Sequence, residues 1–227
     1  MENPLRYEGN KGALTAADMD KLRQSRVFVV GCGALGGFVL EALARLGIGH
    51  ITAADGDVFE VQNLNRQLLA TQVTLGKNKA QEAARRLAEV NPETDFTAVP
   101  AYVLTETAHT LLEGNDVVLD CAGELCERRM LIAVCANLGI PLITAAISGW
   151  DAQVTVILPN SGTYDRICPP EVEETPVNGS PAFSPMAAAA LQVAETVKLL
   201  CGKGKSLTDC VLSVDFLRQE YRTIQLL

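Results

Sequence analysis

The chain has 227 residues, of which 48% are apolar, and its formal net charge at pH 7 is −8. This length and apolar content predict one globular domain over residues 1–227, and the net negative charge argues against a broad surface for nucleic acid or anionic membrane. No apolar run approaches the roughly 20 residues that span a bilayer, and the first residues lack the layout of a signal peptide, so we expect a cytoplasmic protein.

The first half of the chain alternates between strand and helix patterns. Thr15 is a suitable N-cap for a short first helix, and the β-branched run RVFVVG predicts a buried first strand. The helical spacing that follows ends at Gly47, a good C-cap. Pro92 stops the next amphipathic helix, and Pro100 places the third strand near a sheet edge. The expected strands are residues 26–31, 50–55 and 94–103, and the expected helices are 16–24, 33–47 and 78–90.

The second half continues this alternation and then changes after Trp150. There the run DAQVTVILP alternates apolar and polar residues, as an antiparallel strand does. Residues 159–185 are expected to form a long loop rich in Pro, Gly, Asn and Glu. A loop of this length in a compact domain usually has a function. The other expected elements are a short helix ending near 114, strands 116–123 and 140–149, helices 125–139 and 186–202, and a closing hairpin over 210–226.

The order of these elements predicts the fold class. Five strands alternate with helices before the antiparallel segments begin. Such an order is typical of an α/β fold with a doubly wound, Rossmann-like, mainly parallel sheet. We therefore expect that sheet with an antiparallel C-terminal extension.

The segment VVGCGALGG places Gly31, Gly33 and Gly36 as G-x-G-x-x-G between a strand and a helix. Such glycines let the backbone approach a phosphate at the helix N-terminus. Ala34 lies within the same turn and is also predicted to bind the nucleotide. Asp55 follows Gly36 by 19 residues, at a strand end where a carboxylate can accept the ribose hydroxyls. The alternative for the glycines is tight strand–helix packing without a ligand.

Two cations and two amides follow the second strand. Asn63, Arg66 and Gln67 lie in NLNRQ, and Lys79 comes shortly after, downstream of Asp57. A hydride-transferring dehydrogenase has little use for two cations over the phosphates, whereas an enzyme that attacks the α-phosphate of ATP stabilises charge there. Arginine offers a planar fork for phosphate oxygens and lysine a point charge, and the amides can orient the triphosphate. The alternative is a surface arginine and a solvated lysine.

In these segments the chain resembles the ThiF/MoeB/HesA family, the bacterial relatives of ubiquitin-activating enzymes. Similar stretches include NLNRQLL, TLGKNKAQEAARRLAEVNP, DVVLDCAG and GIPLITAAISGWDAQVTV. The resemblance implies adenylation, by ATP, of the C-terminal glycine carboxylate of a small ubiquitin-like sulfur carrier that ends in Gly-Gly. It also implies release of pyrophosphate and a homodimer.

By the same resemblance, Asp55 binds the ribose, and Asn63, Arg66 and Lys79 hold the phosphates. Gln67 belongs to the same motif. Many members also carry two C-x-x-C zinc knuckles, and this chain has none, which matches a short, zinc-free form.

Two positions depart from the family pattern. Gly123 stands where the family usually has an aspartate that helps to hold Mg²⁺, which leaves Asp120 and Glu124 as candidate ligands. Gly9 stands where an N-terminal arginine is expected to reach the partner subunit's ATP, and Lys11 is the nearest replacement. These departures keep a second function open, a nucleotide- or carrier-binding module without adenylation. A third, an NAD-linked oxidoreductase, shares the glycine turn but has no identifiable proton donor.

Cys168 is the one cysteine in a polar loop. In relatives a cysteine on this crossover segment can link covalently to the activated carrier. A nearby Arg166 would favour the thiolate, and three neighbouring glutamates would disfavour it. The alternative is an incidental thiol, and the loop itself is either a cover over the carrier tail or a surface connection.

The other cysteines are expected to be reduced and mostly buried, Cys121 and Cys126 among them. His50 and His109 are expected to be surface or capping residues, because the carrier carboxylate is already ionised and needs no base.

Overall fold

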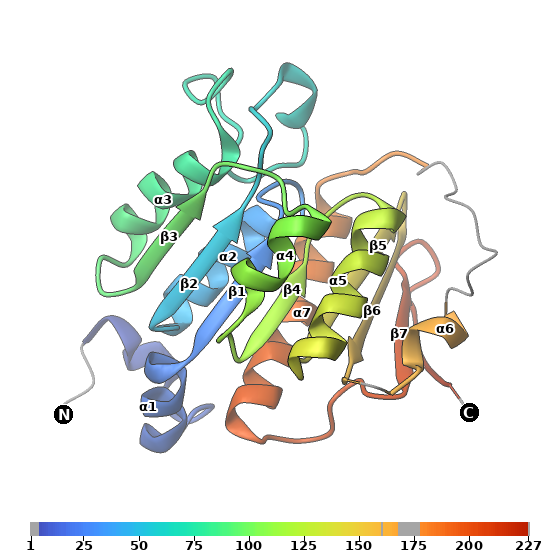
Figure 1. Ribbon diagram of the computed structural model, residues 1–227. Coiled ribbons are helices and arrows are strands. Elements are labelled where there is room, and N and C mark those ends of the chain that lie inside the picture. Colours follow the sequence, from blue (N-terminus) through green and yellow to red (C-terminus); the bar gives the residue numbers. More distant parts are fainter. Residues whose placement is uncertain (1–4, 160, 168–177, 227) are drawn as a thin grey trace.

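The computed structural model describes residues 5–159, 161–167 and 178–226, and these residues form one eight-stranded sheet (Figure 1). The strand order is β3-β2-β1-β4-β5-β6-β7-β8. The strands are β1 (Arg26–Val30), β2 (His50–Ala54), β3 (Asp95–Val99), β4 (Val117–Asp120), β5 (Leu142–Ser148), β6 (Asp151–Ile157), β7 (Cys210–Asp215) and β8 (Glu220–Gln225).

The helices lie between these strands in the chain. They are η1 (Leu5–Asn10), α1 (Ala16–Gln24), α2 (Gly36–Leu46), η2 (Val61–Asn63), α3 (Lys79–Val90), α4 (Thr105–Leu112), α5 (Leu125–Leu138), α6 (Thr163–Ile167) and α7 (Phe183–Cys201). Among the described residues, no helix is both long and apolar enough to span a membrane.

The sheet is parallel from β3 to β5 and antiparallel from β5 to β8. β1 lies between β2 and β4, and all but the first of its residues are buried, which explains its continuous β-branched run. After β5 the chain turns back at Trp150, and β6, β7 and β8 each pair antiparallel with the strand before. The predicted fold class, doubly wound with an antiparallel C-terminal extension, is confirmed.

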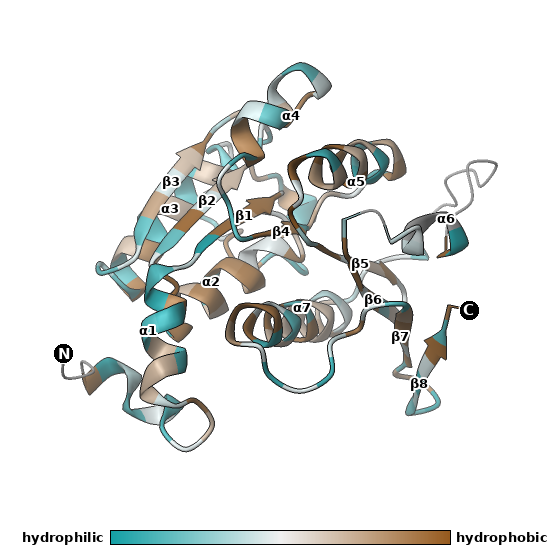
Figure 2. Ribbon diagram, turned by 60° about the horizontal axis from the view of Figure 1, so that its bottom comes forward, coloured by the Kyte–Doolittle hydropathy of each residue, from teal (hydrophilic) through white to brown (hydrophobic). Residues whose placement is uncertain are grey.

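Helices cover both faces of the sheet (Figure 2). On one face α4 and α5 pack over a buried cluster that includes Phe28, Leu112 and Leu131. On the other face α1, α2, α3 and α7 enclose the larger cluster, to which Leu40 and Val193 belong. This two-sided burial leaves the ends of the strands as the place where polar groups can gather.

The predicted helix ends follow local chemistry. The Thr15 hydroxyl accepts from the backbone N–H of Asp18, and the Asp18 carboxylate accepts from the Thr15 N–H, which forms a capping box. Gly47 ends α2 in the left-handed conformation at φ 87°.

Three sequence expectations need correction. The third strand ends at Val99 instead of continuing to residue 103, because Pro100 has no N–H to extend the ladder. The expected loop over 159–185 contains the short helix α6, and α7 begins within it at Phe183. Cys126, expected in the core, is exposed in the first turn of α5.

Candidate active site

A cavity of about 770 Å³ opens at the carboxyl ends of the parallel strands. It lies where the chain winds from β1 to β2 on one side and to β4 on the other, the usual ligand site of open α/β sheets. Its volume is within the range typical of small-molecule sites. The residues predicted for the site that line it are Gly31, Gly33, Ala34, Asp55, Asp57, Arg66, Gln67 and Lys79.

The three motif glycines have different duties. Gly31 adopts φ 93°, and a Cβ there would lie 2.6 Å from the Cys121 carbonyl oxygen. A Cβ at Gly36 would lie 1.8 Å from the Gly31 carbonyl oxygen, so Gly36 serves the packing of the turn and does not line the cavity. At Gly33 the nearest atom to a Cβ is Gln67 Nε2 at 3.5 Å, an ordinary contact. Gly33 is therefore not demanded by packing and leaves the turn open toward the cavity.

Asp55 ties the glycine turn to the end of β2. One carboxylate oxygen accepts from the Cys32 backbone N–H at 2.7 Å and the other from the Asp57 N–H at 2.9 Å. Burial raises the pKa of the Asp55 carboxyl, and these two backbone hydrogen bonds oppose the rise. The carboxylate is thus held rigidly at the cavity wall, with lone pairs left for a ligand hydroxyl.

Lys79 points its ammonium group at Asp57. Lys79 Nζ lies 2.9 Å from Asp57 Oδ2, and the Tyr102 hydroxyl donates to the other oxygen of the same carboxylate. These partners, Tyr102 first, hold the pKa of Asp57 below its usual value. The Tyr102 ring lies over Gly56, where a Cβ would come within 2.6 Å of the ring, so a side chain there would displace Tyr102.

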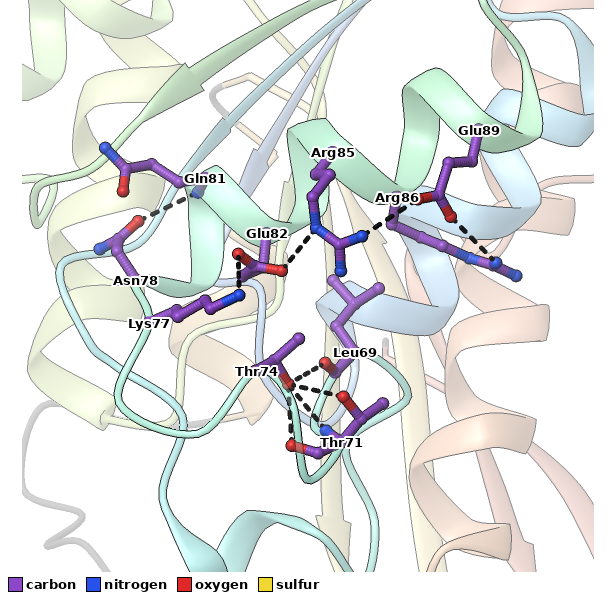
Figure 3. A network of polar contacts seen from close by, with 10 residues as sticks. All are labelled: Leu69, Thr71, Thr74, Lys77, Asn78, Gln81, Glu82, Arg85, Arg86 and Glu89. Atoms are coloured by element: carbon purple, nitrogen blue, oxygen red, sulfur yellow. Dashed lines mark hydrogen bonds and ion pairs between the residues drawn. The ribbon is translucent and has the colours of Figure 1, made fainter.

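Asn78 places Lys79, and the sequence did not single it out. Its amide nitrogen donates to the backbone carbonyls of Asp55 and Asp57, at 3.0 and 3.1 Å. Its amide oxygen caps α3 by accepting from the Gln81 N–H (Figure 3). One side chain therefore joins the β2 end to the helix that begins at Lys79, and an asparagine just before a predicted helix is the signal that could have revealed it.

The loop between Leu69 and α3 is held by Thr74 (Figure 3). The Thr74 hydroxyl donates to the Leu69 carbonyl at 2.9 Å and accepts from the Thr71 N–H at 2.7 Å. At the start of α3, the largely buried Glu82 carboxylate pairs with Arg85 at 2.9 Å and lies 3.7 Å from Lys77 Nζ. These contacts stabilise the loop that links the arginine segment to Lys79.

The arginine segment supplies one wall of the cavity. Half-buried Arg66 lines the cavity, and its guanidinium group donates to the Gln62 carbonyl and to Asn65 Oδ1, both at 2.9 Å. Gln67 is 7% exposed, and its Oε1 has no hydrogen-bond partner among the residues that the structure describes. Asn63 is buried and does not line the cavity, because its Oδ1 accepts from the Glu60 N–H at 3.0 Å and caps η2.

Asp120, predicted as a Mg²⁺ ligand, is fully buried and lies outside the cavity lining. One oxygen accepts from Arg128 Nε and from the Thr144 hydroxyl, both at 2.6 Å, and the other accepts from the Ala122 N–H at 3.1 Å. An ion would have to replace the guanidinium group and enter the core. Asp120 therefore does not fit a magnesium site; it is the buried partner of Arg128.

Glu124 also lies outside the cavity lining. Its carboxylate is exposed and accepts from the Cys126 thiol at 3.5 Å. The described ranges contain no cluster of three or more His, Cys, Asp or Glu side chains arranged for a metal. Gly123 does line the cavity, and nothing lies within 4 Å of a Cβ built there.

The sequence did not point to three further residues of the cavity wall, Tyr102, Glu127 and Arg128. Tyr102 follows the third strand, which ends earlier than the sequence predicts, and the other two lie on α5, where the sequence predicts a helix but no site. These side chains reach the cavity because segments distant in the sequence pack together, and a local sequence pattern does not predict that packing.

Two other predicted features are Cys168 and Gly9. Cys168 is outside the described residues; the neighbouring Arg166 donates to the Leu226 carbonyl at 3.0 Å. Gly9 is exposed in η1, away from the cavity lining, and Arg6 beside it donates to Asn91 Oδ1 of the same chain at 2.6 Å.

Comparisons with known proteins identify relatives of this chain. The family model described as the ThiF family matches residues 8–226. The chain is 32% identical over 209 residues to the SAMP-activating enzyme E1 of Haloferax volcanii, with 90% of this chain and 77% of that protein covered. It is 33% identical over 187 residues to the sulfur carrier protein ThiS adenylyltransferase of Escherichia coli, with 80% and 74% covered. A crystal structure of E. coli MccB with MccA-N7isoASN superposes with a TM-score of 0.87 at 21% identity, over 100% of this chain and 72% of that one.

Proposed function

This chain belongs to the ThiF family, and on that premise we propose that it is an ATP-dependent adenylyltransferase of a small ubiquitin-like sulfur-carrier protein. Its substrate is the C-terminal glycine carboxylate of a carrier ending in Gly-Gly, and its products are the acyl-adenylate and pyrophosphate. Adenylyltransferase chemistry is the type that its relatives support. Membership of this family argues against an NAD-linked oxidoreductase, a function with which the glycine turn alone is compatible.

One observation carries the proposal. Arg66 and Lys79 come from different segments and line the same cavity as the glycine turn and Asp55. A carboxylate oxygen of the carrier attacks the α-phosphorus of ATP, the bond from that phosphorus to the bridging oxygen breaks, and pyrophosphate leaves. Negative charge grows on the non-bridging oxygens during this step, and two cations facing them stabilise it. No base is needed, because a carboxyl group with an ordinary pKa is ionised at pH 7.

Two further parts of the proposal, a homodimer and sulfur transfer in cofactor biosynthesis, rest on the family resemblance. A single adenylation domain over residues 1–227 and a cytoplasmic location stay expectations from the sequence. Neither Asp120 nor Glu124 lies open to the cavity, so neither would hold Mg²⁺ there.

The test is ATP–pyrophosphate exchange with magnesium and the small Gly-Gly proteins encoded near this gene. Exchange should require one of these carriers, and Arg66→Ala should lower kcat/KM by about 100-fold, as expected when one charge-stabilising group is lost. Arg45→Ala is the matched control, since Arg45 is exposed on α2 and outside the cavity lining. Undiminished exchange in Arg66→Ala would contradict the proposal.

A binding module without adenylation is the second candidate. Two observations favour it. Asp120 is buried and paired with Arg128, and Gly123 stands where the family usually has an aspartate, so the cavity lacks that carboxylate beside Gly123. Calorimetry separates the two functions: tight ATP or carrier binding without exchange supports the module.

A further inference from the structure

Charged groups line the cavity. Lys79 is bonded to Asp57, and the Asp57 N–H donates to Asp55. The Tyr102 hydroxyl donates to the same Asp57 carboxylate, and Tyr102 and Glu127 both line the cavity. With the phosphates at the cations and the ribose at Asp55, the base takes another part of the cavity, and Glu127 is a charged residue of the lining that can meet it.

The surroundings of Glu127 are otherwise apolar. Val103 is 6% exposed within the core cluster under α4 and α5, and Ala122 and Leu125 pack against that cluster. All three line the cavity, as does Tyr102. Helices α4 and α5 are packed neighbours, and the segment leading from β3 into α4 passes close to the start of α5 (Figure 1). A flat heteroaromatic ring suits such a slot between apolar side chains.

The Glu127 carboxyl group accepts a hydrogen bond from the backbone N–H of Glu124 and keeps lone pairs for a ligand. Glu127 is half-buried, burial raises its pKa, and the neighbouring carboxylates Glu124, Asp120 and Asp55 raise it further. Over the described part of the chain, no Lys, Arg or His forms an ion pair with it, although other glutamates such as Glu41 and Glu195 have such pairs. A partly desolvated acceptor at the end of an apolar slot is stabilised by a ligand that brings an N–H donor.

We propose that Glu127 accepts a hydrogen bond from the exocyclic amino group of adenine and so selects ATP among nucleotides. The assignment rests on the proposed function, because it takes ATP as the ligand of this cavity. Glu127 keeps an acceptor oxygen whether or not it is protonated. Val103, Leu125 and the Tyr102 ring would cover the faces of the base, and the Glu127 carboxyl group would accept a hydrogen bond from the amino group at its edge.

The test compares ATP with purine riboside triphosphate, which lacks only the amino group. Calorimetric titration of the full chain should give a dissociation constant roughly tenfold or more lower for ATP, as expected for one hydrogen bond to a charged group. In Glu127→Leu the two constants should become equal within about twofold. Glu127→Gln keeps a neutral acceptor and should retain part of the preference.

The control is Glu124→Gln, one turn earlier on the surface and outside the cavity lining, which should keep the wild-type ratio. Thermal unfolding of each variant checks the fold. An unchanged preference for ATP in Glu127→Leu overturns the assignment while the proposed function stands. Failure of the wild-type chain to bind ATP overturns both, and the two failures are therefore distinguishable.

Discussion

The glycine motif shows how one residue type serves two purposes within six positions. Gly31 and Gly36 are required because backbone atoms occupy the space that a side chain would take, whereas Gly33 faces Gln67 at an ordinary distance. The motif therefore combines fold-determining glycines with one that faces the cavity. Sequence spacing alone does not separate these duties.

Gly36→Ala should destabilise the fold. The added methyl group would lie 1.8 Å from the Gly31 carbonyl oxygen, and backbone must move to admit it. We expect a loss of about 1–3 kcal/mol in the free energy of unfolding, measured by urea denaturation. Gly123→Ala is the control, because nothing lies within 4 Å of a Cβ there, and its stability should stay within about 0.5 kcal/mol of wild type. Equal stabilities for the two variants would contradict this account.

At the scale of the element, the start of α3 does the most to position the site. Asn78 caps the helix and holds the two carbonyls at the end of β2, so the position of Lys79 follows from both contacts. The N-terminus of α1 is similar in kind, because its capping box includes Asp18, and Asp18 also pairs with Lys203 beyond the end of α7 at 2.9 Å. Helix caps here are therefore also tertiary contacts.

Asn78→Ala should lower both stability and ATP affinity. Loss of the cap alone costs about 1 kcal/mol, and loss of the bonds to Asp55 and Asp57 frees the start of the helix from the strand end. We expect a higher KM for ATP in the exchange assay. Asn78→Asp keeps an oxygen for the cap but has no N–H donor for the carbonyls. It should recover stability more than KM, and equal recovery of both would argue against the positioning role.

The stability of α1 should depend on acid pH. Hydrogen bonds from Thr15, and then the contact with Lys203, lower the pKa of Asp18 from 3.8 to about 2. A lowered pKa in the folded state means that the contribution is complete above the unfolded value near 3.8 and is lost as the pH falls toward 2. The difference in unfolding free energy between wild type and Asp18→Ala should therefore shrink from pH 5 to pH 2. A difference that stays constant over this range would contradict the prediction.

At the scale of the whole molecule, one buried aspartate joins four elements. Asp120 at the end of β4 accepts from Arg128 of α5 and Thr144 of β5, and its backbone carbonyl accepts from Gln192 of α7 at 2.9 Å. Both faces of the sheet and the turn from β4 into α5 are thus connected through it. This arrangement also explains why Asp120 is unavailable to a metal.

Arg128→Leu should destabilise the protein strongly, because it leaves the fully buried Asp120 without its cation. Breaking one side of a buried pair costs about 3–5 kcal/mol. Thr144→Val removes one neutral donor and should cost less, on the order of 1–3 kcal/mol. The double variant Asp120→Asn with Arg128→Leu should recover part of the loss in urea denaturation. A loss in Arg128→Leu no greater than that in Thr144→Val would show that the pair matters little.

The sequence by itself determined the succession of elements, the parallel-to-antiparallel change after Trp150 and the glycine turn with Asp55. Hydrophobic periodicity, caps and glycine spacing are local signals, and they act over a few residues. The sequence also predicted that Arg66 and Lys79 bind the same triphosphate, and these roles stay predictions.

Only the tertiary structure decided that Asp120 is paired with Arg128, that Asn63 caps a turn, and that Tyr102 and Glu127 face the cavity. Each of these outcomes depends on which side chains from distant segments compete for the same space and the same hydrogen bonds. That competition is settled by packing, and no short stretch of sequence encodes it.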